Sequence, residues 1–176
     1  MTKHRTSLQG AAAPLDAETR VTADHHQSLR VWLRLLACTN LIENHVRQRL
    51  QAQFGTTLPR FDLMAQLERA PQGLKMGELT RRLMVTGGNV TGITDMLEAE
   101  GLVARTPDPD DQRALRVKLT RAGEQQFRRM AQEHERWVVE LFDDLTVKQK
   151  THLAELLAAL KMSAGQRVAT QGSARS

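Results

Sequence analysis

The sequence predicts a mainly α-helical chain that carries one β-hairpin between its fourth and fifth helices. Apolar residues recur at helical spacing over most of the chain after residue 22. Glycines and prolines interrupt this pattern at intervals that separate successive helices. By contrast, residues 115–119 alternate apolar and basic side chains, which is the pattern of a half-buried strand.

Composition bounds the class of protein. A chain of 176 residues is long enough for one ordinary domain with a sizeable core. The net charge of +5 and the pI of about 10.0 favour a polyanionic partner such as nucleic acid, although proteins that bind none carry similar charge. No apolar stretch reaches the roughly 18 residues that cross a bilayer, and the N-terminus lacks the apolar region of a signal peptide. We expect a cytoplasmic protein without a membrane partner.

The first half of the chain predicts four helices. Residues 1–22 show no periodicity and are expected to be a disordered tail, whereas a long helix follows from about Ala23 to Phe54 and stops at Gly55. A short helix with Pro59 in its first turn comes next, and another runs from about Met76 to Leu83. After the break MVTGG, a further helix carries three apolar residues on one face: Val90, Ile93 and Leu97. Two short helices with a tight connection are a helix-turn-helix candidate.

The second half predicts the hairpin and two more helices. The two strands flank the Pro/Asp-rich turn within residues 105–114, and Thr120 then caps a long helix with an apolar stripe. Thr146 and Gln149 have the spacing of a capping box at the start of the final helix. That helix is expected to bury Leu153, Leu156, Leu157 and Leu160, and residues 164–176 are expected to be a second disordered tail.

A helix-turn-helix followed by a hairpin predicts a winged helix, which suits duplex DNA because a helix fits the major groove while the hairpin loop reaches a minor groove. In that loop, Pro107 and Pro109 would stiffen the tip, and Asp110 or Asp111 would orient Arg113 by a charge-assisted hydrogen bond. The alternative is a solvated turn with incidental ion pairs, each worth only about 0 to 1 kcal/mol.

Three stretches resemble the MarR (multiple antibiotic resistance regulator) family over about residues 25–162: LPRFDLMAQLERAP, MGELTRRLMVTGGNVTGITDMLEAEGLVART and DPDDQRALRVKLTRAGEQQF. The resemblance implies a homodimeric winged helix-turn-helix repressor that a small molecule or oxidation releases from DNA. It implies a DNA-binding lobe over residues 58–119, with dimerisation helices over 23–57 and 120–163. The alternative is that other parts of the same chain cover the apolar surface of the terminal helices.

Carried over by position, the recognition helix begins near Thr86. Asn89 would read an adenine edge, Thr91 would meet a thymine methyl or a phosphate, and Asp95 lies on the same face. The expected DNA-binding residues are Arg81, Arg82, Thr86, Gly88, Asn89, Thr91, Gly92, Asp111 and Arg113. Arg81 and Arg82 could equally form an ordinary solvated basic face. The sequence departs from the family in having Gly92 and Met96 where arginine is frequent.

The resemblance also places an effector between the dimerisation helices and the lobe. Candidate binding residues there are His25, His26, Trp32, Arg34 and Arg60. Cations beside a flat apolar wall suit a small aromatic carboxylate or its CoA thioester, and MVTGGNVTG resembles regulators of aromatic-acid catabolism. The alternative for each residue is structural, with Trp32 in the core and the others solvated.

Other functions find less support. Cys38 permits a cysteine-based redox-responsive regulator, but the chain has no tyrosine to activate the thiol, and a buried, inert Cys38 is expected. The six histidines show no metal-ligand spacing, and no phosphate-loop, GxSxG or HExxH motif is present. We therefore expect no enzyme, no catalytic residues, no metal and no cofactor. A winged-helix protein-interaction module without DNA binding remains the competing class.

Overall fold

The computed structural model describes residues 27–83, 87–109, 111 and 114–173. Several positions singled out by the sequence lie outside these ranges: the N-terminal tail 1–22, His25, His26, Thr86, Asp110 and Arg113. The described chain divides into two units, one ending at His45 and one beginning at Val46. Both contain part of α1 (Gln27–Phe54), which confirms the long first helix. No helix of the described chain has the length and apolar character needed to cross a bilayer.

The first unit consists, where described, of α1 up to His45. Its large apolar side chains are exposed, including Leu29, Trp32 and Leu41 at 44%, 54% and 71%. Trp32 therefore lies on the surface of the described chain, and the alternative that placed it in the core is wrong for this chain. The physical reason is that no described element of this unit packs over it.

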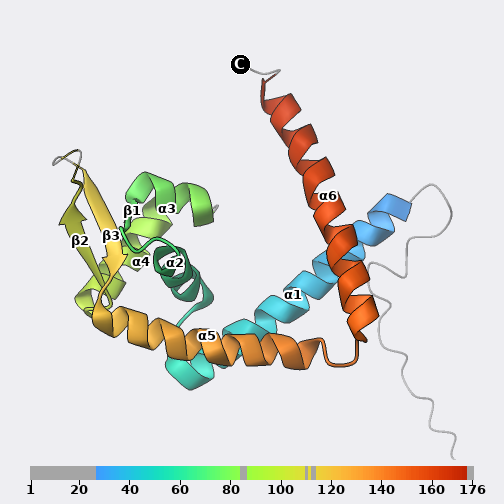
Figure 1. Cartoon of the computed structure of the whole chain (residues 1–176), viewed down its shortest axis with the longest axis horizontal. Helices are drawn as coiled ribbons and strands as arrows, with labels where there is room; N and C mark the ends of the chain where they lie inside the picture. The colour runs from blue at the N-terminus through green and yellow to red at the C-terminus, as the bar shows by residue number, and fades with distance from the viewer. Residues whose placement is uncertain (1–26, 84–86, 110, 112–113, 174–176) are drawn as a thin grey trace, which may run out of the picture. The chain divides into compact units, whose positions relative to one another are not determined.

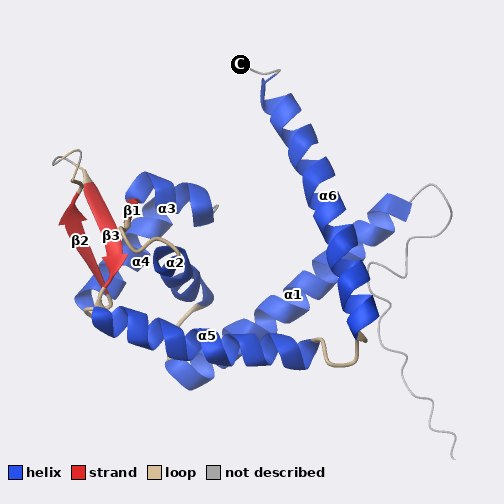
Figure 2. Cartoon of the chain, viewed as in Figure 1, coloured by secondary structure: helices blue, strands red, loops and turns tan. Residues whose placement is uncertain are grey.

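The second unit contains a small lobe of three helices and a three-stranded antiparallel sheet with strand order β1-β3-β2 (Figures 1 and 2). The register pairs Leu74 with Val117 and Arg105 with Val117 on opposite sides of β3. In chain order the elements are α2 (Leu58–Glu68), β1 (Leu74–Lys75), α3 (Met76–Leu83), α4 (Gly87–Ala99), β2 (Val103–Pro107) and β3 (Leu115–Leu119). The winged helix is thus confirmed, and β1 is an addition that the sequence pattern did not predict.

The core of this lobe is formed by the apolar faces that the periodicity predicted. Val90, Ile93 and Leu97 of α4 are 0%, 5% and 0% exposed. They lie with fully or almost fully buried side chains of the neighbouring elements, among them Leu63, Met64 and Leu67 of α2, Leu79 of α3 and Val117 of β3. Helix α2 is enclosed by its neighbours, whereas α3 and α4 each bury one face and leave residues of the opposite face exposed.

A tight corner joins the sheet to α5 (Arg121–Leu141). Thr120 caps this helix by accepting a hydrogen bond from the Gly123 N–H at 3.0 Å, and its own hydroxyl donates to the Gly101 carbonyl. The Thr120 N–H donates to the Leu102 carbonyl at 3.0 Å. A Cβ added to Gly123 would lie 1.9 Å from that same carbonyl oxygen. The sequence LT-x-x-G thus encodes a close approach of helix and strand that only glycine permits.

The final helix, α6 (Val147–Ser173), begins with the predicted capping box. The Thr146 N–H donates to Gln149 Oε1 at 2.8 Å, and the Gln149 N–H donates back to Thr146 Oγ1. The expected burial of the four leucines of α6 does not occur within one chain: they are 38% to 55% exposed, because no other described element covers them. The alternative in which a single chain covers this surface is therefore wrong for α6. The helix also continues to Ser173 through the expected disordered tail, since alanine, glutamine and arginine are good helix formers.

Candidate nucleic-acid interface

The helix-turn-helix pair consists of α3 and α4. At the start of α3, the Lys75 N–H donates to Glu78 Oε2 at 2.8 Å, which satisfies a backbone donor of the first turn. Arg81 and Arg82 are in its last turn, both exposed, and neither forms an ion pair with another described residue. The two guanidinium groups are therefore available to an outside anion such as a phosphate.

Helix α4 presents an exposed face opposite its buried one. Asn89, Thr91 and Gly92 are exposed, and so are Asp95 and Met96. Open space lies above Gly92, where an added Cβ would meet nothing within 4 Å. Gly88 belongs to the first turn of the helix, whose backbone N–H groups lack helical partners. The structure thus places Asn89, Thr91 and Gly92, among the expected recognition residues, on one accessible surface.

The wing is organised by an acid that the sequence interpretation did not single out. Asp108 is 1% exposed, and its Oδ2 lies 2.5 Å from Arg116 Nε of β3 and 3.3 Å from Lys75 Nζ of β1. Its Oδ1 accepts the Asp111 N–H at 3.0 Å. Asp108, which directly follows β2, therefore links β1 and β3 to Asp111. A buried carboxylate needs such cationic partners, but no local sequence signal points to Asp108, because its partners lie on other strands and β1 was not predicted.

The predicted role of the wing tip stays a prediction. Asp110 and Arg113 lie outside the described residues, so the proposed pairing of an aspartate with Arg113 is not on view. Asp111 is described and exposed, and its backbone is tied to Asp108. The base of the loop is closed by the Asp108 N–H, which donates to the Ala114 carbonyl at 2.9 Å. Hydrogen bonds therefore join Asp108 to Asp111 and to Ala114, on either side of the position of Arg113 in the sequence.

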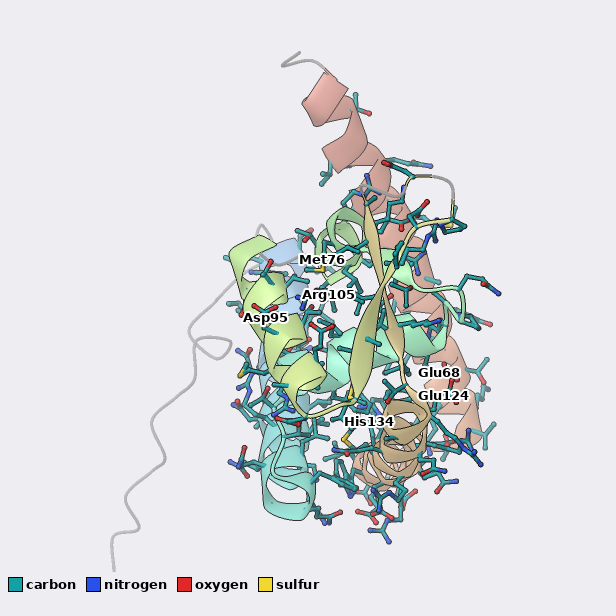
Figure 3. The ribbon with its side chains drawn as sticks, turned by 90° about the vertical axis from the view of Figure 1, so that its left-hand side faces the viewer. Glu68, Met76, Asp95, Arg105, Glu124 and His134 are labelled. Atoms are coloured by element: carbon teal, nitrogen blue, oxygen red, sulfur yellow. The ribbon has the colours of Figure 1, made fainter. Side chains whose placement is uncertain are left out.

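The wing is also joined to the recognition helix. Arg105 of β2 forms ion pairs with Asp95 and Glu98 of α4, and Figure 3 shows Arg105 and Asp95 side by side. Beyond the end of the same helix, Glu100 forms an ion pair with Arg60 of α2. Arg105 of β2 thus pairs with the two acids of α4, and Arg60 of α2 pairs with Glu100, which follows that helix.

The five expected effector residues do not fall within one described unit, so their grouping stays a prediction. His25 and His26 lie outside the described residues, Trp32 and Arg34 belong to the first unit, and Arg60 belongs to the second. Within the second unit, a cavity of about 210 Å³ contains none of the five; it is lined by Leu67, Glu68, Pro71, Leu119, Glu124, Phe127, Arg128 and Ala131. Figure 3 labels its two acids, Glu68 of α2 and Glu124 of α5.

The structure also shows the surroundings of Cys38 and of His134. Cys38 is exposed on α1, so the expectation of a buried thiol is wrong; the neighbouring side chains of α1 are exposed as well, and no described element covers them. His134 of α5 is half-buried against the ring of Phe61, 4.9 Å between centroids, and burial lowers the pKa of its imidazole. The apolar stripe of α5 therefore contains one titratable group that favours its neutral form.

A family model and a relative of known name match this chain. A family model described as MarR family matches residues 56–115, which span α2 to the start of β3. The transcriptional activatory protein BadR of Rhodopseudomonas palustris is 30% identical over 131 residues, which cover 73% of this chain and 74% of that protein. The chain belongs to the MarR family. It is a transcriptional regulator that binds DNA.

Solved structures agree with this assignment. The MarR family regulator Sco3205 of Streptomyces coelicolor, solved in complex with DNA, is 27% identical with a TM-score of 0.69, covering 81% of this chain and 90% of that one. A MarR family regulator of Silicibacter pomeroyi is 31% identical with a TM-score of 0.69, covering 81% of this chain and 99% of that one. The winged helix of this MarR-family chain therefore has experimentally determined counterparts.

Proposed function

We propose that this MarR-family regulator binds a palindromic operator as a homodimer, with α4 in the major groove and the wing in the adjacent minor groove. The exposed face of α4, beside the available Arg81 and Arg82, is the observation that carries the proposal. A helix of this kind fits the major groove, and flanking cations suit the phosphates. A similar Streptomyces coelicolor regulator was solved in complex with DNA, which supports DNA binding.

The proposed homodimer accounts for the apolar surface of α6. Leu156 and Leu160 are 55% and 44% exposed in the chain, and Leu153 and Leu157 share their side of the helix. A contiguous apolar stripe of this kind marks an interaction surface, and a two-fold symmetric dimer covers it with the same stripe of a second copy. Two recognition helices then meet half-sites about 34 Å apart, one turn of DNA.

We further propose that operator binding represses transcription and that a small aromatic acid or its CoA thioester relieves it. Arg34, Arg60 and the adjacent His25 and His26 supply the cationic or titratable groups that a carboxylate needs, and Trp32 supplies an exposed flat wall. The similar Rhodopseudomonas palustris protein is named an activatory protein, so the direction of regulation needs its own test. The proposal places this regulation in the cytoplasm and assigns the chain no enzymatic reaction.

Substitutions in α4 and the wing test the docking mode. On a duplex selected from a randomised palindromic pool, Asn89→Ala should cost about 1 to 3 kcal/mol, because a bidentate base contact is lost. Arg113→Ala should cost the same if it reaches a base edge, or flatten the salt dependence by about one unit if it reaches a phosphate. Fluorescence anisotropy at several salt concentrations measures both.

Arg129→Ala is the matched control, because Arg129 is exposed on α5 away from the helix-turn-helix. It should leave the affinity for the selected duplex unchanged. Unaltered affinity and salt slope in both Asn89→Ala and Arg113→Ala would show that α4 and the wing do not contact DNA in this way.

Thermal-shift measurements test the effector. A ligand that binds the folded state raises its stability by about 2.7 kcal/mol at 100 times its Kd, so benzoate-like acids and their CoA thioesters should raise the Tm. The active compound should then restore transcription from an operator template in a purified system. Replacing Arg60 by Met should abolish the shift. Transcription that rises on adding the protein alone would contradict repression.

A further inference from the structure

The recognition helix has an unusual charge for a helix that faces DNA. Within Gly87–Ala99 the only charged side chains are Asp95 and Glu98, and both are acidic. Asp95 shares the exposed face of α4 with Asn89 and Gly92, and its side chain is 59% exposed. A free carboxylate at this position would face the phosphate groups of a bound duplex, and like charges repel. The helix therefore needs a cation from another element.

Arg105 of β2 supplies that cation with well-defined geometry. Its Nη2 lies 2.5 Å from Asp95 Oδ1, its Nη1 forms an ion pair with Glu98 Oε2, and its backbone N–H donates to Glu98 Oε1 at 3.1 Å. Its side chain is 21% exposed, whereas those of Asp95 and Glu98 are 59% and 37% exposed. One guanidinium thus bridges two acids on successive turns of α4, and the bridge ties the helix to the wing. Figure 3 labels Arg105 and one of the two acids, Asp95.

The environment of Arg105 keeps it charged. Burial acts to lower the pKa of its guanidinium, but the hydrogen bonds to Asp95 and Glu98 and the attraction of their negative charges together outweigh burial and raise that pKa above its usual value. The planar fork of an arginine suits this double contact, whereas a lysine ammonium is a single point charge. Arg105 is therefore committed to α4 in the described chain and is not extended toward solvent.

We propose that Arg105 is a positioning residue of the DNA-reading surface, which acts through α4 by neutralising Asp95 and Glu98 and by fixing the helix relative to the wing. This inference rests on the proposed docking of α4 in the major groove. Arg105 itself touches neither base nor phosphate. Its loss weakens operator binding because two unpaired acids then face the DNA and because the angle between α4 and the wing is no longer held.

A double-mutant cycle in the full-length protein tests the inference on the duplex selected with the wild-type chain. Arg105→Gln should weaken binding about 10-fold or more at low salt. In the background Asp95→Asn with Glu98→Gln, the same Arg105→Gln change should alter affinity less than about threefold, because there are no acids left to neutralise. Circular dichroism confirms that each variant is folded at the temperature of the titration.

The contrary result is equally specific. If Arg105 contacts a phosphate directly, Arg105→Gln costs as much or more in the acid-free background, since the freed guanidinium then binds DNA without competition. That outcome, or an unchanged affinity of Arg105→Gln in the wild-type background, overturns the proposal. Arg105→Lys should recover only part of the affinity, because one ammonium cannot hold both acids.

A surface ion pair elsewhere in the chain provides the control. Arg136 of α5 lies near Glu133 and Glu140, so Arg136→Gln also breaks a bridge between one arginine and two acids. It should leave operator affinity unchanged. A wild-type protein that binds no duplex would instead refute the proposed function, which is a result distinct from any outcome of the cycle.

Discussion

Replacing Gly123 by alanine is expected to destabilise the protein by about 3 kcal/mol, because overpacking at a rigid contact costs this much or more. The new Cβ would lie 1.9 Å from the Leu102 carbonyl oxygen and 2.9 Å from its carbon. These are backbone atoms, and the same oxygen accepts the N–H of Thr120, so it cannot move away without breaking a hydrogen bond to the residue that caps α5. Urea denaturation followed by circular dichroism measures the change.

Gly165→Ala is the matched control for this change. Gly165 is also helical, but a Cβ there would meet nothing within 4 Å. Alanine favours a helix over glycine by about 1 kcal/mol, so this variant should be as stable as the wild type or slightly more stable. Both variants are compared at one protein concentration, because the proposed dimerisation would make stability depend on concentration. A Gly123→Ala protein that matches Gly165→Ala would mean that the corner between sheet and α5 is not tight.

Charges introduced into the apolar stripe of α6 are expected to abolish high-affinity operator binding. Leu156→Glu with Leu160→Glu should convert the dimer to a monomer, because each copy would bring two carboxylates into an apolar contact. A monomer binds one half-site, so its affinity for the selected duplex should fall by roughly 100-fold or more through the loss of bivalent binding. Sedimentation velocity and anisotropy, respectively, measure the two effects.

Ala158→Glu controls for the added charge. At 100° per residue, Ala158 points away from the side of α6 that carries Leu156 and Leu160. This variant should remain dimeric and bind DNA with wild-type affinity. Dimers that persist in the double leucine variant would place the dimer interface elsewhere.

The helices of the lobe could be predicted from apolar periodicity and from the prolines and glycines that interrupt it. The pattern at Val90, Ile93 and Leu97 predicted the buried face of α4, and the Pro/Gly breaks predicted the limits of α3 because these residues end helices for local steric reasons. The strand β1 was missed since two residues are too few to show an alternating pattern. The helical continuation of α6 does not follow from the small, polar composition of residues 164–173, which is typical of disorder, although the alanine and glutamine within it favour a helix.

The ion pairs that shape the interface could not be predicted from the sequence. Asp108 meets Lys75 from a strand more than 30 positions away, and Arg60 meets Glu100 across 40 positions. Such contacts depend on the packing of whole elements, which local patterns do not specify. The sequence did predict that Asn89, Thr91 and Gly92 of α4 are exposed, because these positions lie outside the apolar face of the helix.

The stoichiometry of the complex tests the proposed mode of binding most directly. Sedimentation equilibrium of the full-length protein with the selected palindromic duplex should give two chains per duplex, and the binding constant should fall steeply with salt. One chain per duplex, or no binding to any duplex at low ionic strength, would contradict a dimer that reads two half-sites with paired copies of α4.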